Sequence, residues 1–231
     1  MFKQIQNRID QWRLDWQSDI ENPENRRQAV RDMNWFDHGI LRRYWPNQVE
    51  IAPGVWRSNQ PSPARLDQLE KIGIRSILSL RHEVHFGSVW LERYECARRG
   101  IPLEFLPLNA AMLPSASEIH ALNACFARLE KPFLIHCKSG ADRAGLASAL
   151  YLLLQTDATP RDALKQLSLR HIHLRWSKKG VLDYFLEHYR DTHDRTGVGF
   201  LDWIDSDYDP VAITKGFNRS RRFNRAKEWQ L

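Results

Sequence analysis

Cys137 and Arg143 are the two residues of this chain most suited to chemistry, and five residues separate them. The surrounding stretch, residues 133–154, begins with a short apolar run, passes through small residues and continues as a segment rich in alanine and leucine. This pattern predicts a buried strand, a tight loop and a buried helix. Backbone N–H groups of such a loop and the helix dipole converge on one point, where they can bind an anion. Gly140 allows the loop to turn with its amides facing inward.

The chemistry expected of this loop is attack on a bound phosphate. A thiol at a helix N-terminus near a fixed cation loses its proton readily, so we expect Cys137 to be a thiolate near neutral pH. The guanidinium of Arg143 can bind two phosphate oxygens through paired N–H groups. Together they describe a nucleophile directed at a phosphorus atom that amides and a guanidinium hold. The alternative is a buried cysteine at a strand end, with an unrelated arginine on the next helix.

The loop carries a family resemblance. His136 and Cys137, five further residues and then Arg143, with Gly140 between, resemble the signature loop of the cysteine-dependent protein tyrosine and dual-specificity phosphatase superfamily. The stretch 55–81 is also similar to the opening half of the compact dual-specificity phosphatases. The resemblance implies hydrolysis of phosphate monoesters through a phosphocysteine intermediate, without a metal or another cofactor.

The position of the general acid departs from the usual pattern of this superfamily. Most members carry an Asp on a separate loop, but the matching stretch here, residues 106–115, contains no acidic residue. Asp142, directly before Arg143, is therefore the candidate to protonate the leaving oxygen. A loop with Asp before the Arg is similar to that of some bacterial phosphatases acting on phosphoproteins and inositol lipids. The alternative is that Asp142 only caps the helix or braces Arg143.

Ala144 is a second departure, because the superfamily usually has Ser or Thr after the Arg, and that hydroxyl helps to release the thiolate. An alanine predicts slow hydrolysis of the intermediate, unless Ser139 or Ser148 supplies a hydroxyl. An alternative function follows, namely a phosphatase-like module that binds phosphate and turns over weakly. Sulfur transfer is disfavoured by the spacing from Cys137 to Arg143. The residues expected to contact the substrate phosphate are Lys138, Ser139, Gly140, Ala141 and Ala144.

Composition indicates a globular chain with an anionic partner. The 231 residues are 42% hydrophobic and 27% charged, enough for one sizeable core with extensions. The net charge of +6 favours anionic substrates and predicts no nucleic-acid partner. Together with Lys138 it favours an inositol, lipid or sugar phosphate, and the alternative is a phosphoprotein of the phosphotyrosine type. The three cysteines lack disulfide or metal spacing, and the first residues lack the apolar core of a signal peptide, so we expect a cytoplasmic location. The sequence leaves the oligomeric state open.

The elements that must position the loop alternate between strand and helix patterns. This alternation predicts an α/β fold with a central, mostly parallel sheet flanked by helices and the cysteine loop at the carboxyl ends of the strands. Pro53 and Gly54 mark a turn between two short strands, and Ser62 and Pro63 mark a helix start. Further strands are predicted over 74–80, 102–108 and 133–135, and further helices over 115–130, 160–170 and 178–190.

The chain is predicted to have three parts. Residues 1–48 form a helical extension packed on the core, with a helix start at Pro23; residues 49–190 form a catalytic domain of the dual-specificity phosphatase type; and residues 191–231 form a charged tail. Tryptophans in the first quarter either dock the extension on the core or form an exposed interaction surface. They are Trp12, Trp16, Trp35, Trp45 and Trp56.

The tail and the connection before residue 178 carry further charged residues and histidines. In the tail, an acidic cluster precedes a basic one, which predicts a partly disordered or surface-docked segment. The alternative is a peripheral membrane contact through the basic cluster. His171 and His173 stand two apart with no further ligand nearby, so no metal site is expected there. The basic cluster consists of Lys215, Arg219, Arg221, Arg222, Arg225 and Lys227.

Overall fold

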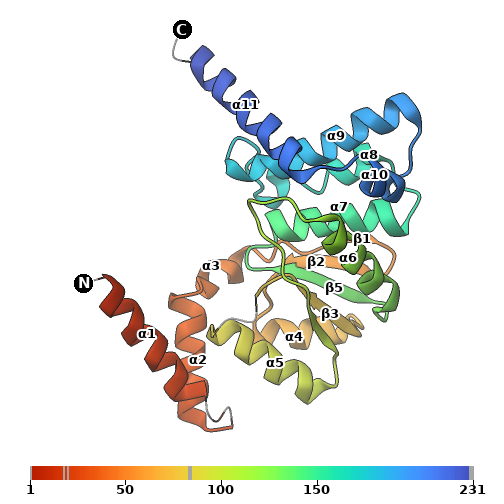
Figure 1. Ribbon diagram of the computed structural model, residues 1–231. Coiled ribbons are helices and arrows are strands. Elements are labelled where there is room, and N and C mark those ends of the chain that lie inside the picture. The colour runs from red at the N-terminus through yellow and green to blue at the C-terminus, as the bar shows by residue number, and fades with distance from the viewer. Residues whose placement is uncertain (1, 18, 20, 83–84, 229–231) are drawn as a thin grey trace. The chain divides into compact units, whose positions relative to one another are not determined.

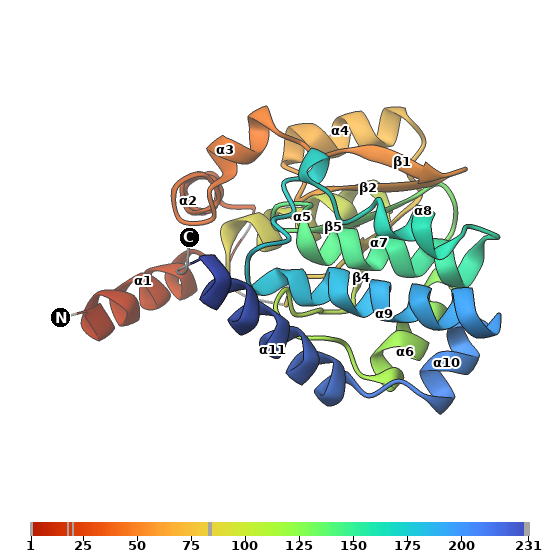
Figure 2. The same cartoon turned by 90° about the horizontal axis from the view of Figure 1, so that it is seen from above.

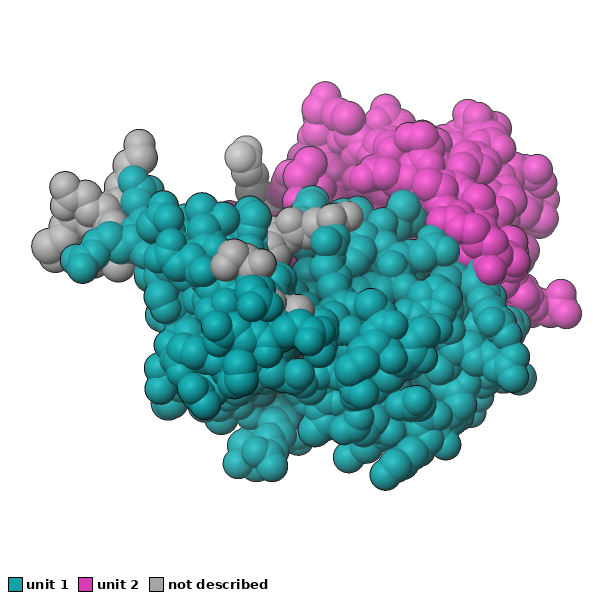
Figure 3. Space-filling model, turned by 90° about the horizontal axis from the view of Figure 1, so that it is seen from below, with its two compact units in different colours: residues 1–107, 129–140 teal, residues 108–128, 141–231 magenta. Residues whose placement is uncertain are grey.

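The computed structural model describes residues 2–17, 19, 21–82 and 85–228, and it divides into two compact units, coloured separately in Figure 3. Unit 1 contains the chain up to Pro107 together with Leu129–Gly140. Unit 2 contains Leu108–Arg128 together with the chain from Ala141 onward. The division falls inside the cysteine loop, between Gly140 and Ala141. The predicted division into residues 1–48, 49–190 and 191–231 is a different partition and stays a prediction.

Unit 1 holds a five-stranded sheet in the order β1-β2-β5-β3-β4 (Figure 1). The strands are β1 (Val49–Ala52), β2 (Val55–Asn59), β3 (Ser76–Ser79), β4 (Leu103–Phe105) and β5 (Phe133–Cys137). β1 and β2 are antiparallel, and the other neighbours are parallel, so the predicted α/β class with a mostly parallel sheet is confirmed. β3 and β4 are shorter than predicted. For β3 the reason is that the apolar run used for the prediction continues past the paired residues: Ile74 and Leu80 are both buried but lie outside the strand.

In its described residues unit 1 has five helices, and capping residues mark several of their ends. The helices are α1 (Phe2–Gln17), α2 (Pro23–Trp35), α3 (Gly39–Tyr44), α4 (Pro63–Lys71) and α5 (Gly87–Arg99). The side chains of Asn22 and Ser62 accept backbone N–H bonds at the starts of α2 and α4, and each helix has proline as its first residue. α5 ends at Gly100, whose φ of 65° is left-handed. The predicted starts at Pro23 and Pro63 are confirmed.

Two apolar clusters hold unit 1 together. In the first, Leu66 of α4 and Cys96 of α5 pack against Leu134 of β5, so these two helices cover one face of the sheet (Figure 1). In the second, Trp16 of α1 packs with Met33 of α2 and with Leu91 of α5, among other residues. The early tryptophans divide between the two expected behaviours: Trp12 and Trp16 pack into this second cluster, whereas Trp35 and Trp45 are 71% and 51% exposed.

Unit 2 is helical. Its elements are α6 (Ala116–Arg128), α7 (Asp142–Gln155), α8 (Pro160–Leu164), the 3-10 turns η1 (Leu169–His171) and η2 (Lys178–Gly180), α9 (Val181–Thr196), α10 (Phe200–Ser206) and α11 (Pro210–Glu228). Figure 2 shows α7, α8 and α9 side by side, and α8 packs on both of the others. The predicted helix over 160–170 is shorter in the structure, and the one over 178–190 extends to Thr196, where Gly197 has a φ of 72°.

The tail was predicted to be partly disordered or surface-docked, and its described residues form docked helices. α10 places Phe200 and Trp203 against Phe185 of α9, and Phe217 of α11 is buried as well. The charged clusters hid a helical spacing of apolar residues, whose burial offsets the entropy of ordering the segment. The side chains of Arg222, Arg225 and Lys227 lie outside the described residues. No helix in the described ranges combines the length and the apolar character that crossing a bilayer requires.

Candidate active site

β2 fixes the first half of the cysteine loop. Cys137 is the last residue of β5, lies beside Asn59 in the parallel pair and is 1% exposed. Gly140 has a φ of 71°, and a Cβ atom there would lie 2.6 Å from the backbone nitrogen of Asn59 and 2.7 Å from the carbonyl carbon of Ser58. Arg57, fully buried on β2, donates to the Gly140 carbonyl at 2.6 Å. The loop therefore turns where only glycine fits, against a strand that binds its backbone.

A buried carboxylate, Asp37, lies next to this loop at the end of α2. It accepts from Arg81 at 2.7 Å, pairs with Arg42 at 3.0 Å and contacts the Lys138 ammonium at 3.1 Å. Burial alone would raise the pKa of Asp37, but Arg81 and the other partners outweigh it and hold this pKa well below its usual range. Lys138, predicted to contact the substrate, is thus bound to a carboxylate of unit 1 while its side chain stays partly exposed.

His136 belongs to the same polar network. Its Nε2 lies 3.0 Å from Oε1 of Glu92, and both side chains are fully buried. Glu92 accepts from the Gln60 amide at 2.5 Å, and the Gln60 carbonyl accepts from Arg81 at 2.6 Å. Hydrogen bonds therefore connect Glu92 to Asp37 through Gln60 and Arg81, whereas His136 Nε2 and Glu92 Oε1 are close but make no hydrogen bond among the described residues. Such a network stiffens the segment it holds.

The second half of the loop lies in unit 2. Ala141 precedes α7, and Asp142 and Arg143 begin it, so Asp142 is in the first turn and does not occupy the N-cap position. Ala144 is fully buried and Arg143 is half-buried. The eight predicted site residues thus divide equally: Cys137, Lys138, Ser139 and Gly140 are in unit 1, and Ala141, Asp142, Arg143 and Ala144 are in unit 2.

Asp142 carries two cationic partners within unit 2. Its Oδ1 accepts from His173 Nδ1 at 2.8 Å, and its Oδ2 lies 2.5 Å from the Lys179 ammonium. On the other side of the imidazole, His173 Nε2 lies 2.6 Å from Oδ2 of Asp183. Asp142, His173 and Asp183 are all buried. A histidine with a carboxylate at each nitrogen donates at both, which is the imidazolium form.

The charges of this group reinforce one another. Burial lowers the pKa of His173, but hydrogen bonds to Asp142 and Asp183 outweigh it and raise the pKa to about 9. Burial raises the pKa of Asp142, but His173 and Lys179 outweigh it, so the net shift is downward. Near neutral pH the group therefore consists of an imidazolium held between two carboxylates, one of which begins α7.

Sequence reasoning missed His173, Asp183 and Asp37 as parts of these networks. For His173 the sequence predicted only that no metal site lies there, because its hydrogen-bond partners are 31 and 10 residues away in the chain. Asp37 binds Arg81 across 44 residues. The sequence showed only that these three residues are ionisable and close to helix ends, which does not identify their partners.

Other side chains bear on nucleophile, hydroxyl and metal chemistry. Burial and the nearby Glu92 raise the pKa of Cys96 far above that of an ordinary thiol, which leaves it inert. Ser148 lies one turn after Ala144 on α7, and its buried hydroxyl has no hydrogen-bond partner among the described residues. Within the same residues, no cluster of His, Cys, Asp and Glu is suited to a metal ion.

Comparison with solved structures supports the fold. P. aeruginosa TpbA in complex with pTyr is 19% identical, with a TM-score of 0.50, and the match covers 64% of this chain and 91% of that one. A mutant form of Tk-PTP gives 19% identity, a TM-score of 0.50 and coverage of 64% and 99%. The core catalytic domain of the S. cerevisiae PP-IP phosphatase SIW14 gives 18% identity, a TM-score of 0.49 and coverage of 65% and 93%. No curated protein matches the chain.

The sheet and the cysteine loop define a cysteine-dependent phosphatase of the protein tyrosine and dual-specificity superfamily, as the sequence predicted. Residues 52–179, more than half of the chain, match the family described as the Swiss Army Knife protein DSP-PTPase phosphatase domain. The chain belongs to this family. The matched range contains the whole loop from Cys137 to Arg143, and it leaves out the helices α1 to α3 and the helices from α9 onward.

Proposed function

We propose that the chain hydrolyses phosphate monoesters with Cys137 as the nucleophile, Arg143 as the phosphate ligand and Asp142 as the proton donor and acceptor. The observation that carries the proposal is the loop after β5, which falls inside the family match and turns at Gly140 against the backbone of β2. Its backbone has the turn that an anion-binding loop needs. The other loop residues that would contact the phosphate are Lys138, Ser139, Ala141 and Ala144.

In the first step the Cys137 thiolate attacks the phosphorus atom and the bond to the leaving oxygen breaks. Loop amides and Arg143 stabilise the charge on the three equatorial oxygens. The leaving oxygen takes a proton through Asp142, which is a carboxylate in the resting state and relays this proton from His173. Because His173 keeps Asp142 ionised in the resting state, this proton comes from the imidazolium Nδ1, 2.8 Å away.

In the second step a water molecule attacks the phosphocysteine. Asp142, now a carboxylate, accepts the proton of this water, and the S–P bond breaks to release phosphate and the thiolate. The proton passes back to His173, which restores the imidazolium between Asp142 and Asp183. Lys179, 2.5 Å from Asp142, stabilises the carboxylate in this half of the cycle.

The substrate class follows from charge and family. A basic chain of this family would act on a phosphoprotein of the phosphotyrosine type or on an inositol, lipid or sugar phosphate. The expected cytoplasmic location and a contact of the basic cluster with a membrane surface belong to the same proposal.

A second candidate function is a phosphate-binding module with weak turnover. Ala144 favours it, because this fully buried position offers no hydroxyl to the departing thiolate. In that case the first step still occurs, and phosphocysteine accumulates. A burst of leaving group equal to the enzyme concentration, followed by a rate far below the burst rate, distinguishes this function from efficient hydrolysis.

Turnover of an aryl phosphate tests the proposal. Cys137→Ser and Arg143→Ala should abolish turnover, whereas the matched controls Cys125→Ser and Arg161→Ala should keep it. Asp142→Asn should reduce kcat about 10²–10⁴-fold on substrates with poor leaving groups and less on good ones. Full activity of Cys137→Ser would refute the nucleophile, and wild-type kcat of Asp142→Asn on poor leaving groups would refute the acid.

A further inference from the structure

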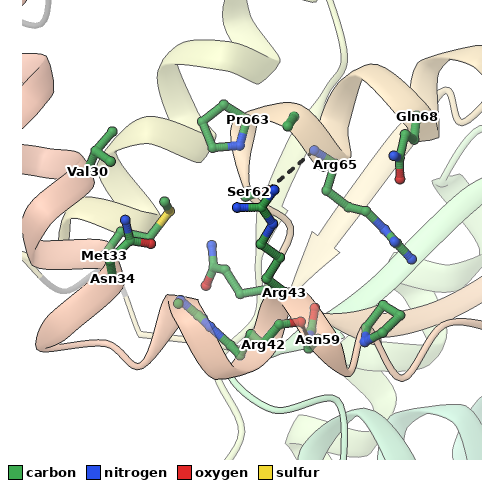
Figure 4. Close-up of a pocket in the computed structure, with 14 residues that line it drawn as sticks. Val30, Met33, Asn34, Arg42, Arg43, Asn59, Ser62, Pro63, Arg65 and Gln68 are labelled. Atoms are coloured by element: carbon green, nitrogen blue, oxygen red, sulfur yellow. Dashed lines mark hydrogen bonds between the residues drawn. The ribbon is translucent and has the colours of Figure 1, made fainter.

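Unit 1 contains a cavity of about 550 Å³, called here the basic pocket (Figure 4). Its walls come from α2, α3, the connection to β1, the end of β2 and the start of α4. The charged residues among those that line it are Arg42, Arg43 and Arg65, and the lining contains no carboxylate. A cavity with cationic walls and no acidic residue favours an anionic occupant.

The arginines of the basic pocket are under-neutralised. Arg65 donates Nε and Nη2 to the neutral amide oxygen of Gln48, at 3.1 and 2.5 Å. Burial lowers the pKa of Arg65, and no carboxylate acts against this shift. Arg43 has no carboxylate partner among the described side chains, and Figure 4 shows it reaching across the pocket towards Ser62.

Arg42 is the most buried arginine of the basic pocket. It shares its carboxylate, Asp37, with Arg81 and Lys138, so one negative charge faces three positive ones. Its side chain is only 10% exposed, and its Nε has no hydrogen-bond partner in the described part of the chain. A buried, unpaired N–H donor is costly unless something accepts from it. An anionic oxygen in the basic pocket would supply that acceptor.

The first turn of α4 adds to the attraction. Ser62 caps this nine-residue helix, and Pro63, Ala64 and Arg65 line the basic pocket. Pro63 has no N–H group and that of Arg65 is bonded to Ser62, so the positive end of the helix dipole and the N–H group of Ala64 are what favour an anion at this position. Phosphate oxygens suit both the N–H groups and the paired donors of arginine.

Residues that line the basic pocket bind the backbone of the cysteine loop. Asn59 lines the basic pocket and lies beside Cys137 in the sheet, where neighbouring strands are about 4.8 Å apart. The backbone N–H of Gln60 and Nη1 of Arg42 donate to the Lys138 carbonyl at 3.3 and 3.5 Å, and both residues line the basic pocket. A ligand in the basic pocket would therefore contact residues that neighbour or bind the loop that holds the nucleophile.

We infer that the basic pocket binds a phosphate group, and that its ligand is a small molecule with at least two phosphates, one of which occupies the cysteine loop. This inference rests on the proposed function. Residues 30–46, which build half of the basic pocket, lie outside the range that matches the family, so the site is a property of this chain's own extension. It favours polyphosphorylated small molecules over singly phosphorylated proteins as substrates.

Binding to the full chain with Cys137→Ser tests the basic pocket without turnover. Inositol hexakisphosphate and inorganic phosphate are the probes, followed by calorimetry. Arg43→Gln and Arg65→Gln should each weaken inositol hexakisphosphate binding about tenfold, the effect of losing one charged phosphate contact. Arg75→Gln, which removes an exposed arginine just before β3 and outside the basic pocket, should not change it. Equal affinity of all four proteins would overturn the inference.

Kinetics on otherwise unmodified protein separates the two proposals. The ratio of kcat/KM for a hexose bisphosphate to that for 4-nitrophenyl phosphate should fall about tenfold in Arg43→Gln and stay constant in Arg75→Gln. A constant ratio in Arg43→Gln, together with weaker binding of inorganic phosphate, would mean a separate free-phosphate site and overturn the two-phosphate ligand. Absence of turnover on every substrate would refute the proposed function, and the binding result would still decide the basic pocket.

Discussion

Removal of the His173 imidazole should expose how strongly unit 2 depends on its buried charges. In His173→Gln, the carboxylates of Asp142 and Asp183 lose the cation between them, although Lys179 still contacts Asp142. Breaking a buried ion pair by removing one partner costs about 3–5 kcal/mol. With Lys179 left in place, we expect a loss near the lower end of that range at pH 6.

The pH dependence of stability gives the sharper test. The pKa of His173 rises from 6.5 to about 9 on folding, so the folded chain keeps a proton that the unfolded chain loses. The stabilisation is therefore complete below pH 6.5, falls as the pH rises and is absent above about pH 9. A shift of this size corresponds to about 3 kcal/mol, which solvent screening of the group reduces.

Urea unfolding at half-unit steps from pH 6 to pH 10 measures this effect. Wild type should lose about 2–3 kcal/mol of unfolding free energy between pH 6.5 and pH 9, and His173→Gln should lose far less over that range. His120→Gln is the matched control, because His120 pairs with Asp205 at an exposed site worth at most about 1 kcal/mol. Equal slopes for wild type and His173→Gln would refute the charge assignment of this group.

Three further results are expected. Ala144→Ser should restore the usual hydroxyl and shrink the burst in stopped-flow turnover of an aryl phosphate, with steady-state kcat rising about tenfold or less; a larger burst would contradict the role given to Ala144. Gly140→Ala forces a Cβ atom to 2.6 Å from the β2 backbone and should cost about 2–4 kcal/mol in thermal unfolding, whereas Gly73→Ala, where nothing lies within 4 Å, should cost about 1 kcal/mol. Asp37→Asn should lower both kcat and unfolding free energy, by about 2–4 kcal/mol for the latter, because three cations lose their carboxylate; an unchanged midpoint in urea would show that the network carries no stability.

The sequence predicted those features that depend on local spacing. The helix start at Ser62 and Pro63 follows from the chemistry of two adjacent residues, and the strand, loop and helix around Cys137 follow from one contiguous stretch. In both cases the determining contacts lie within a few residues of each other. Short-range physics decides them before the rest of the chain is known.

What the sequence did not predict depends on long-range pairing. The contact of Asp142 with His173 spans 31 residues, and no periodic pattern announces it. The choice between a disordered and a docked tail has the same origin, since Phe200 and Trp203 become apolar anchors only when α9 supplies Phe185. Charge density left both states open because it ignores which neighbour is present.

The carboxylate at the end of α2 sets a lower limit on the size of a working protein. A fragment trimmed to the family's boundary at residue 52 would lack Asp37 but keep Arg81 and Lys138. These two cations, one buried and one partly buried, both form ion pairs with Asp37 in the full chain. The first fifty residues therefore supply the negative charge that pairs with Lys138 of the loop. Any shortened version of the protein, natural or engineered, has to keep that carboxylate or replace the basic side chains that pair with it.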